Sequence, residues 1–269
     1  MKAFSLHLLI DLKAGLRDKT LLLMNYLFPL GFYIIIGGIM PKLNPGYLPM
    51  LIPSMMIFSI LVSTLLGLPN SLVASRDSGI FRSYKINGVS KLSMLGIPTV
   101  STVLHTIIVI IIILLSAPIL FNAKLPQDIL GFIIVFIATL IVFSGFAVLI
   151  GVVAQNASTT IIYAQALFLP SMLIGGLMFP TSALPDTITK FGMLLPTTYA
   201  MDAYQVLANN QDASINPVIS IGILILSGLI SFYLSWYLFR FDNNNASKAK
   251  SNIWALGALI PFVLAAILI

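Results

Sequence analysis

The longest uncharged stretch of this chain most constrains its fold. Between Asp128 and Asp186 there are 57 consecutive residues (129–185) without Asp, Glu, Lys or Arg. That length holds two membrane-spanning helices of about 20 residues each and the turn between them. Over the whole chain 59% of residues are hydrophobic and only 8% are charged, too few for the charged surface of a soluble domain. The sequence therefore predicts an all-α, polytopic transmembrane helical bundle.

Apolar runs divide the chain into six core spans and a seventh, C-terminal run. The seventh run, 253–269, has 17 residues, or about 25 Å as a helix against a hydrocarbon core of roughly 30 Å. We expect it to cross the membrane, and partial embedding is the alternative. Residues 1–240 then form the transmembrane domain, and 241–269 a cytoplasmic linker with an extra hydrophobic segment. The six core spans are predicted at about 20–40, 48–73, 95–121, 129–153, 160–179 and 216–239.

The placement of Lys and Arg predicts the orientation. With the N-terminus in the cytoplasm, the inner segments hold eleven of these residues and the outer loops only Lys42, Lys124 and Lys190. Inner loops of membrane proteins carry an excess of Lys and Arg. We therefore expect a multi-pass protein of the cell membrane with a cytoplasmic N-terminus. The net charge of +6 follows this topology, so no nucleic-acid partner is expected.

The residues before the first span predict an interfacial helix. Phe4, Leu8, Leu12 and Leu16 recur every four residues, with charged residues between them. This spacing is typical of an amphipathic helix that lies in the inner membrane interface and contacts lipid. The alternative is an ordinary positively charged flank of the first span.

Missing residue types exclude several kinds of chemistry. The chain has no GxxxxGK[ST] phosphate loop, no Cys and no Glu, and its eight Asp residues fall in predicted flanks or loops. Ion-coupled carriers usually place an ionisable residue inside the bundle, and metal sites need clusters of ligands. We expect no catalytic residue, metal site or cofactor in this chain. His105, predicted inside the third span, is expected to be a hydrogen-bonded packing residue.

A few polar residues within the predicted spans are candidates for a transport pathway. They are also suited to hydrogen bonds between helices, and the sequence does not separate the two roles. These residues are Ser63, Asn70, Gln165 and Ser171.

The loop after the second span, Ser75 to Lys91, is basic and contains a predicted short helix. Asp77 or Ser78 is expected to cap it, and Asn87-Gly88 to end it. Ile80, Phe81 and Tyr84 would share an apolar face that could fill a groove on another protein. The alternative is a positive loop that only sets topology.

The outer segment from Phe179 to about Pro217 is too hydrophobic for a solvated loop and too rich in proline for a full span. It predicts two short helices resting at the outer membrane interface.

Three features of the chain resemble one family. They are the interfacial helix followed by a span that starts at Phe28-Pro29, the loop Arg76-Asp77-Ser78-Gly79-Ile80-Phe81-Arg82, and the outer pattern of glycine, prolines, Tyr and Asp. The outer pattern runs Gly176-Leu-Met-Phe-Pro180, Leu184-Pro185, then Leu195-Pro196-Thr-Thr-Tyr199-Ala-Met-Asp202-Ala. Over residues 1 to about 240 the chain looks like a permease of the ABC-2 type, the membrane subunit of ATP-driven exporters.

The resemblance implies a transporter subunit that is not itself an enzyme. It implies a separate ABC ATPase subunit that binds ATP and Mg, and a second permease subunit, alike or different. It assigns an ATPase-coupling loop to Arg76, Asp77, Ser78, Gly79, Ile80, Phe81, Arg82, Tyr84 and Lys85, and an outer lid to Pro180, Pro185, Pro196, Tyr199 and Asp202. Two alternatives remain: an ion-coupled or ATPase-independent carrier, and a membrane sensor or immunity protein that transports nothing.

Overall fold

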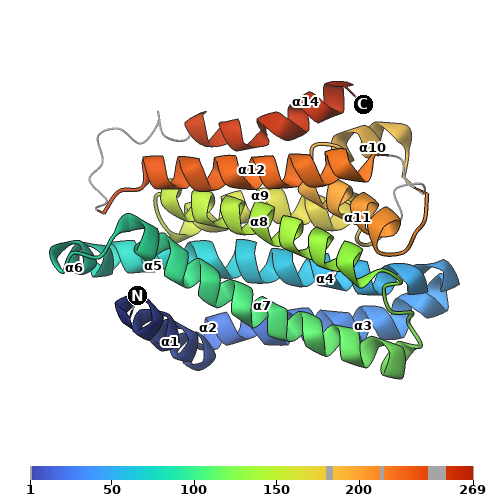
Figure 1. Cartoon of the computed structure of the whole chain (residues 1–269), viewed down its shortest axis with the longest axis horizontal. Helices are drawn as coiled ribbons and strands as arrows, with labels where there is room; N and C mark the ends of the chain where they lie inside the picture. Colours follow the sequence, from blue (N-terminus) through green and yellow to red (C-terminus); the bar gives the residue numbers. More distant parts are fainter. Residues whose placement is uncertain (1, 180–183, 213–214, 242–252, 269) are drawn as a thin grey trace.

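A computed structural model of the chain describes residues 2–179, 184–212, 215–241 and 253–268. All regular secondary structure in these ranges is helical, which confirms the predicted fold class. In Figure 1 the long helices lie roughly parallel and form a bundle. In chain order the first elements are α1 (Lys2–Arg17), α2 (Lys19–Leu22), η1 (Leu23–Leu27), α3 (Phe28–Leu43), η2 (Pro45–Met50), α4 (Leu51–Leu61), η3 (Val62–Gly67), α5 (Leu68–Asp77) and α6 (Ile80–Ile86). They are followed by α7 (Lys91–Phe121), α8 (Ile129–Val153), α9 (Ala157–Ile174), α10 (Asp186–Gly192), α11 (Pro196–Leu207), α12 (Pro217–Leu238), η5 (Leu256–Leu259) and α14 (Ile260–Leu268).

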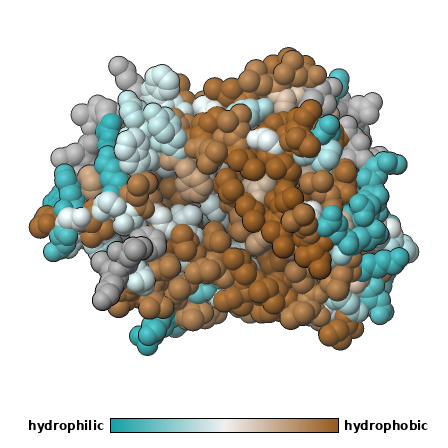
Figure 2. Space-filling view, viewed as in Figure 1, coloured by the Kyte–Doolittle hydropathy of each residue, from teal (hydrophilic) through white to brown (hydrophobic). Residues whose placement is uncertain are grey.

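Six helical stretches are long and apolar enough to cross a membrane, as predicted. They are Lys19–Leu43, Pro45–Asp77, Lys91–Phe121, Ile129–Val153, Ala157–Ile174 and Pro217–Leu238. Figure 2 shows an apolar surface across the middle of the molecule, with hydrophilic residues gathered at both ends. The fifth span ends five residues earlier than predicted, because Gly175 and Gly176 follow Ile174 and Gly176 adopts a left-handed φ of 85°. The protein is a multi-pass membrane protein.

The centre of the bundle is the second span, α4–η3–α5, which is 94% buried over its most apolar window. Around it, α8 and α12 pack closely because both carry glycine where they cross. A Cβ atom on Gly145 would lie only 2.7 Å from the Gly228 carbonyl oxygen. Gly145 and Gly228 thus allow the two helices to approach closely.

The N-terminal helix α1 packs on α7 through a histidine. A Cβ atom on Gly15 would lie 2.9 Å from His105 Nε2, so this glycine lets the two helices meet. His105 is 3% exposed, and its Nδ1 hydrogen-bonds the Tyr26 hydroxyl at 2.6 Å. The prediction of a packing histidine is confirmed.

The apolar stripe of α1 differs from the predicted one. Leu8 and Leu12 are half-buried, whereas Leu6, Leu9 and Ile10 are more than half exposed. Part of the apolar surface of α1 packs on α7. The apolar residues that stay exposed therefore do not follow the predicted four-residue spacing. Leu16 is exposed, as predicted, and the Phe4 side chain lies outside the described residues.

The C-terminal apolar run is packed into the bundle. It runs beside α12 in Figure 1, and the Ser227 hydroxyl donates to the Ala258 carbonyl at 2.6 Å. Phe262 is fully buried, with its ring centroid 5.5 Å from that of Tyr199 and 6.3 Å from that of Phe146. Ile253–Leu268 is shorter than the six spans, and its crossing of the membrane stays a prediction.

Candidate functional site

The predicted basic loop forms α6 at one end of the bundle, where α5 and α7 meet (Figure 1). Its N-cap is Gly79, with a left-handed φ of 79° and no side-chain hydrogen bond. The prediction that Asp77 or Ser78 caps it is therefore wrong. The Ser78 hydroxyl instead donates back to the Ala74 carbonyl, because α5 continues to Asp77 and leaves only Ser78 and Gly79 to reverse the chain. The predicted end at Asn87-Gly88 is confirmed, with Gly88 at φ 73°.

One side of α6 is anchored on the chain itself. Phe81 is 3% exposed, and its ring meets that of Phe239, at the end of α12, edge-on at 5.3 Å. The Tyr84 hydroxyl hydrogen-bonds His7 Nε2 of α1 at 2.7 Å. Burial raises the pKa of Tyr84, and the Asp11 carboxylate raises it further. The expectation that Phe81 and Tyr84 offer their face to another protein is corrected, because their own chain occupies it.

Arg76 also faces inward. Its guanidinium donates to the carbonyls of Val152, Ala154 and Gln155 at 3.4, 2.8 and 3.2 Å. These carbonyls lie at the C-terminal end of α8, where a helix leaves acceptors unpaired and favours a positive charge. Asp77 pairs with Arg76 at 3.5 Å. Arg76 thus joins the start of the loop to α8.

The other side of α6 is open. Ile80 is 41% exposed, Ile86 is 79% exposed, and Arg82 is also exposed. Lys85 belongs to the anchored side instead, with its ammonium 4.6 Å from the centre of the Phe241 ring. An exposed apolar and basic surface on a firmly anchored helix can bind a protein partner and pass its movement to α1, α8 and α12.

Ile86 is a candidate that the sequence analysis did not single out. Helical spacing in the sequence could have identified it. Phe81, Tyr84 and Lys85 lie on one face at i, i+3 and i+4, which leaves Arg82 and Ile86, four residues apart, on another.

The two short helices predicted between Phe179 and Pro217 form, as α10 and α11, but α11 does not rest at the surface. Eight of its twelve residues are buried, Pro196 and Tyr199 among them, and it packs on α8, α9, α12 and α4. Its buried residues are mostly small, aromatic or apolar and fit between these helices, whereas Asp202 and Gln205 stay partly exposed. Pro185 is the N-cap of α10, and an Asp202 oxygen accepts from the Ile215 amide at 3.2 Å. Pro180 lies outside the described residues.

The four pathway candidates divide into two groups. Ser63 is fully buried, and its hydroxyl donates to the Ser59 carbonyl in its own helix, at 2.6 Å. Asn70 Oδ1, Gln165 Oε1 and the Ser171 hydroxyl are buried and have no hydrogen-bond partner among the described residues. These three sit on α5 and α9, which pack together. Unpaired buried oxygens are costly, so a pathway role for Asn70, Gln165 and Ser171 stays a prediction with a physical basis.

No group of three or more His, Cys, Asp or Glu that could hold a metal ion occurs in the described part of the chain. The acidic residues at the α6 end are single, and Asp77 already pairs with Arg76.

Comparison with known proteins gives two matches. The family model described as ABC-2 type transporter matches residues 4–208. Nodulation protein J of Bradyrhizobium diazoefficiens is 27% identical over 100 residues, which cover 37% of this chain and 38% of that protein. The match thus spans little more than a third of the relative's length. The family match includes α6 and the whole of α11.

Proposed function

The chain belongs to the ABC-2 type transporter family, and from this premise we propose that it is the permease subunit of an ATP-driven exporter. A separate ATPase subunit would bind ATP and Mg at the cytoplasmic face. Two permease subunits, alike or different, would form the pathway between them. The N-terminus and α6 would lie in the cytoplasm, as the bias of Lys and Arg favours.

The observation that carries the proposal is the contrast between the two sides of α6. Its inner side is fixed by Phe81 on Phe239 and by Tyr84 on His7. Its outer side leaves Ile86 79% exposed at a hydrophilic end of the molecule. A large exposed apolar side chain beside basic residues is typical of a protein contact.

The anchors of α6 would carry movement of the ATPase into the bundle. A push on α6 reaches α1 through His7, α12 through Phe239 and α8 through Arg76. These helices would then move together between inward-open and outward-open states. A partner shifts the balance of two states only by binding one of them better, so ATP-driven closure of the ATPases would select one arrangement of α6.

The proposal is tested by co-purification of the chain with an ABC ATPase subunit from the same organism, using Ile86→Asp as the variant. An apolar residue at the centre of a contact is worth about 2 kcal/mol, or roughly 30-fold in affinity. We expect Ile86→Asp to fold normally, to lose most of the bound ATPase and to abolish ATP-dependent export. Leu125→Asp is the matched control, because Leu125 is 53% exposed in the loop between α7 and α8, at the other end of the bundle.

Two results would refute the proposal. ATPase binding that is equal in wild type, Ile86→Asp and Leu125→Asp would remove α6 as the contact. Transport that persists when the ATPase is deleted, and that responds to an ion gradient, would make the chain an ion-coupled carrier.

A further inference from the structure

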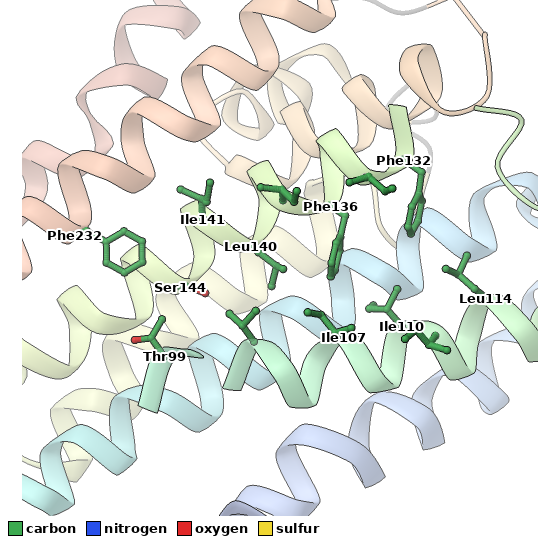
Figure 3. Close-up of a pocket in the computed structure, with 14 residues that line it drawn as sticks. Thr99, Ile107, Ile110, Leu114, Phe132, Phe136, Leu140, Ile141, Ser144 and Phe232 are labelled. Atoms are coloured by element: carbon green, nitrogen blue, oxygen red, sulfur yellow. The ribbon is translucent and has the colours of Figure 1, made fainter. Parts of the chain in front are cut away.

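An apolar groove runs between α7, α8 and α12. Its main part is a cavity of about 540 Å³, within the range of roughly 300–1,000 Å³ of known ligand sites. In Figure 3, Ile107 and Ile110 of α7 point toward Phe136 and Leu140 of α8 across the gap, and Phe232 of α12 lies at one end. Helices α7 and α8 are therefore apart where neighbouring spans usually pack side by side.

The groove continues toward the α6 end of the bundle. A second cavity of about 280 Å³ shares Thr99 and Phe232 with the first and reaches Leu92 and Trp236. From Leu92 to Leu114 the lining residues of α7 recur every three or four positions, along one face of the helix. These 22 residue steps correspond to about 33 Å, close to the roughly 30 Å thickness of the hydrocarbon core.

The lining of the groove suits a hydrocarbon chain. In the larger cavity only Thr99 and Ser144 carry side-chain oxygens, and the Thr99 hydroxyl is already bonded to the Leu95 carbonyl at 2.7 Å. The Ser144 hydroxyl has no hydrogen-bond partner among the described residues and is the one polar group of this lining that is left open. A ligand with several polar groups would therefore lose its water without gaining enough partners there. Ile111, Ile133 and Ile137 in its lining are 50%, 42% and 49% exposed. Since all three walls are candidate membrane spans, this open side would face lipid.

The α6 end of the groove carries groups that suit an anionic head group. The ammonium groups of Lys85 and Lys91 lie 4.6 and 5.8 Å from the centre of one ring, that of Phe241, so both positive charges gather around this ring. Within the described ranges no carboxylate pairs with either ammonium. Tyr233, Trp236 and Tyr237 are exposed on the last turns of α12, and such aromatic residues lie at the level of lipid head groups.

We propose that this groove binds an anionic phospholipid of the inner leaflet, with an acyl chain between α7 and α8 and its phosphate at Lys85 and Lys91. The lipid would act as a wedge that holds α7 away from α8. Because α7 follows α6 directly, the wedge would set how far a movement of α6 can tilt α7. This inference goes beyond the proposed function and takes from it only that the chain spans the membrane with α6 on the cytoplasmic side.

The test uses Trp236 as a reporter, because it lines the groove. The chain has two Trp residues, so Trp254→Phe leaves Trp236 alone. The full chain is stripped of lipid in detergent and titrated with phosphatidylglycerol whose acyl chains carry bromine, which quenches tryptophan fluorescence. Brominated phosphatidylcholine tests the head group, and inorganic phosphate tests whether a free anion competes.

Two variants on the Trp254→Phe background separate the parts of the proposal. Gly96→Leu fills the inner cavity, and a Cβ atom at Gly96 meets nothing within 4 Å, so the fold is expected to persist. Gly31→Leu is its matched control, because Gly31 also has open space but lies on α3, outside the groove. The double variant Lys85→Ala with Lys91→Ala removes the proposed head-group site.

In the protein with Trp254→Phe alone we expect brominated phosphatidylglycerol to quench Trp236 in a saturable way. In Gly96→Leu and in the double-lysine variant we expect the affinity for this lipid to fall about tenfold or more. Gly31→Leu is expected to match wild type, and phosphate not to compete. Equal quenching by both lipids, or unchanged quenching in Gly96→Leu, would overturn the proposal. A third result would also overturn it: no lipid quenching in the reference protein, together with a dimer that Gly96→Leu abolishes. A second copy of the chain, and not a lipid, would then occupy the groove. The assay contains no ATPase, so its outcome is independent of the coupling proposal.

Discussion

Two short helices, α6 and α11, lie at opposite ends of the bundle and differ in how far they are buried (Figure 1). In α6 only Phe81 of seven residues is buried, whereas in α11 eight of twelve are. The exposed side of α6 carries Arg82 and Ile86, while α11 has no Lys or Arg. At the α6 end the chain holds a helix by one face and leaves the other exposed to solvent. At the α11 end it surrounds the helix.

This difference in burial predicts different roles for the two ends of the bundle. A helix held by one face can bind a partner and still transmit force, which is the role that we propose for α6. A surrounded helix can move only with the helices that enclose it, so α11 would follow α4, α8 and α12 when the bundle changes state. The same substitution should therefore have opposite consequences at the two ends.

The largest effect is expected from a carboxylate placed in α11. Ala200 is fully buried, so Ala200→Asp would leave a buried charge without a partner, at a cost of about 3–5 kcal/mol. We expect little folded protein in membranes and early thermal unfolding of what is recovered. Ile86→Asp makes a comparable change in α6 and should leave the yield and the unfolding temperature unchanged. A stable Ala200→Asp protein would show that α11 is open to water.

A smaller loss of stability is expected from the anchor of α6. Phe81→Ala removes the ring that packs on Phe239, and such truncations cost about 3 kcal/mol or more. Thermal unfolding of the purified chain should shift to lower temperature, and ATPase binding should fall as a consequence. Ile86→Ala, the control on the open face, should weaken ATPase binding without changing the unfolding temperature. If Phe81→Ala had normal stability, the anchored-face assignment would be wrong.

The two arginines of the loop separate stability from contact in the same way. Arg76→Gln removes the guanidinium that donates to three carbonyls at the end of α8. Hydrogen bonds to charged groups contribute about 1.5–3 kcal/mol. We expect this substitution to lower the free energy of unfolding by about 2 kcal/mol. Arg82→Gln changes an exposed residue, with an expected effect within about 0.5 kcal/mol, and should mainly weaken ATPase binding. Thermal unfolding and co-purification measured on both variants decide the comparison, and equal stability losses would contradict it.

The architecture could be predicted from the sequence because spans depend on local composition. Runs of 20 or more apolar residues identified all six, and 129–153 was predicted to the residue. Boundaries were less certain where glycine, and not charge, ends the helix, as at Gly175. The burial of α11 could not be predicted, because Tyr199 and Ala200 look equally suited to a membrane interface and to a protein interior.

The site was predicted in position but not in orientation. The basic residues and Gly79 located α6, yet the sequence does not show that Phe239, 158 residues after Phe81, supplies its packing partner. Arg76 was grouped with Arg82 because both are basic and lie in one loop, although only Arg76 reaches the end of α8. Contacts between distant segments decided which side chains stay available, and local spacing carries little information about them.

The smallest effect is expected from the bond that joins α6 to α1. Tyr84→Phe removes the hydroxyl that lies 2.7 Å from His7 Nε2, and a single hydrogen bond contributes about 1 kcal/mol. Tyr237→Phe is the control, because Tyr237 is 66% exposed on α12. We expect thermal unfolding to shift slightly in Tyr84→Phe and not in Tyr237→Phe.

The pH dependence of unfolding makes the Tyr84 prediction specific. Burial, and then Asp11, raises the pKa of Tyr84 in the folded chain, so the folded state keeps the phenol proton when the unfolded state has lost it. Since the folded state then binds more protons, stability falls as pH rises above the ordinary tyrosine pKa of about 10. Below that pH the contribution of Tyr84 is fully present. Tyr84→Phe should therefore lose less stability than wild type as the pH rises above about 10. If the pH dependence of unfolding were the same in both proteins, the α1–α6 contact would not depend on this hydroxyl.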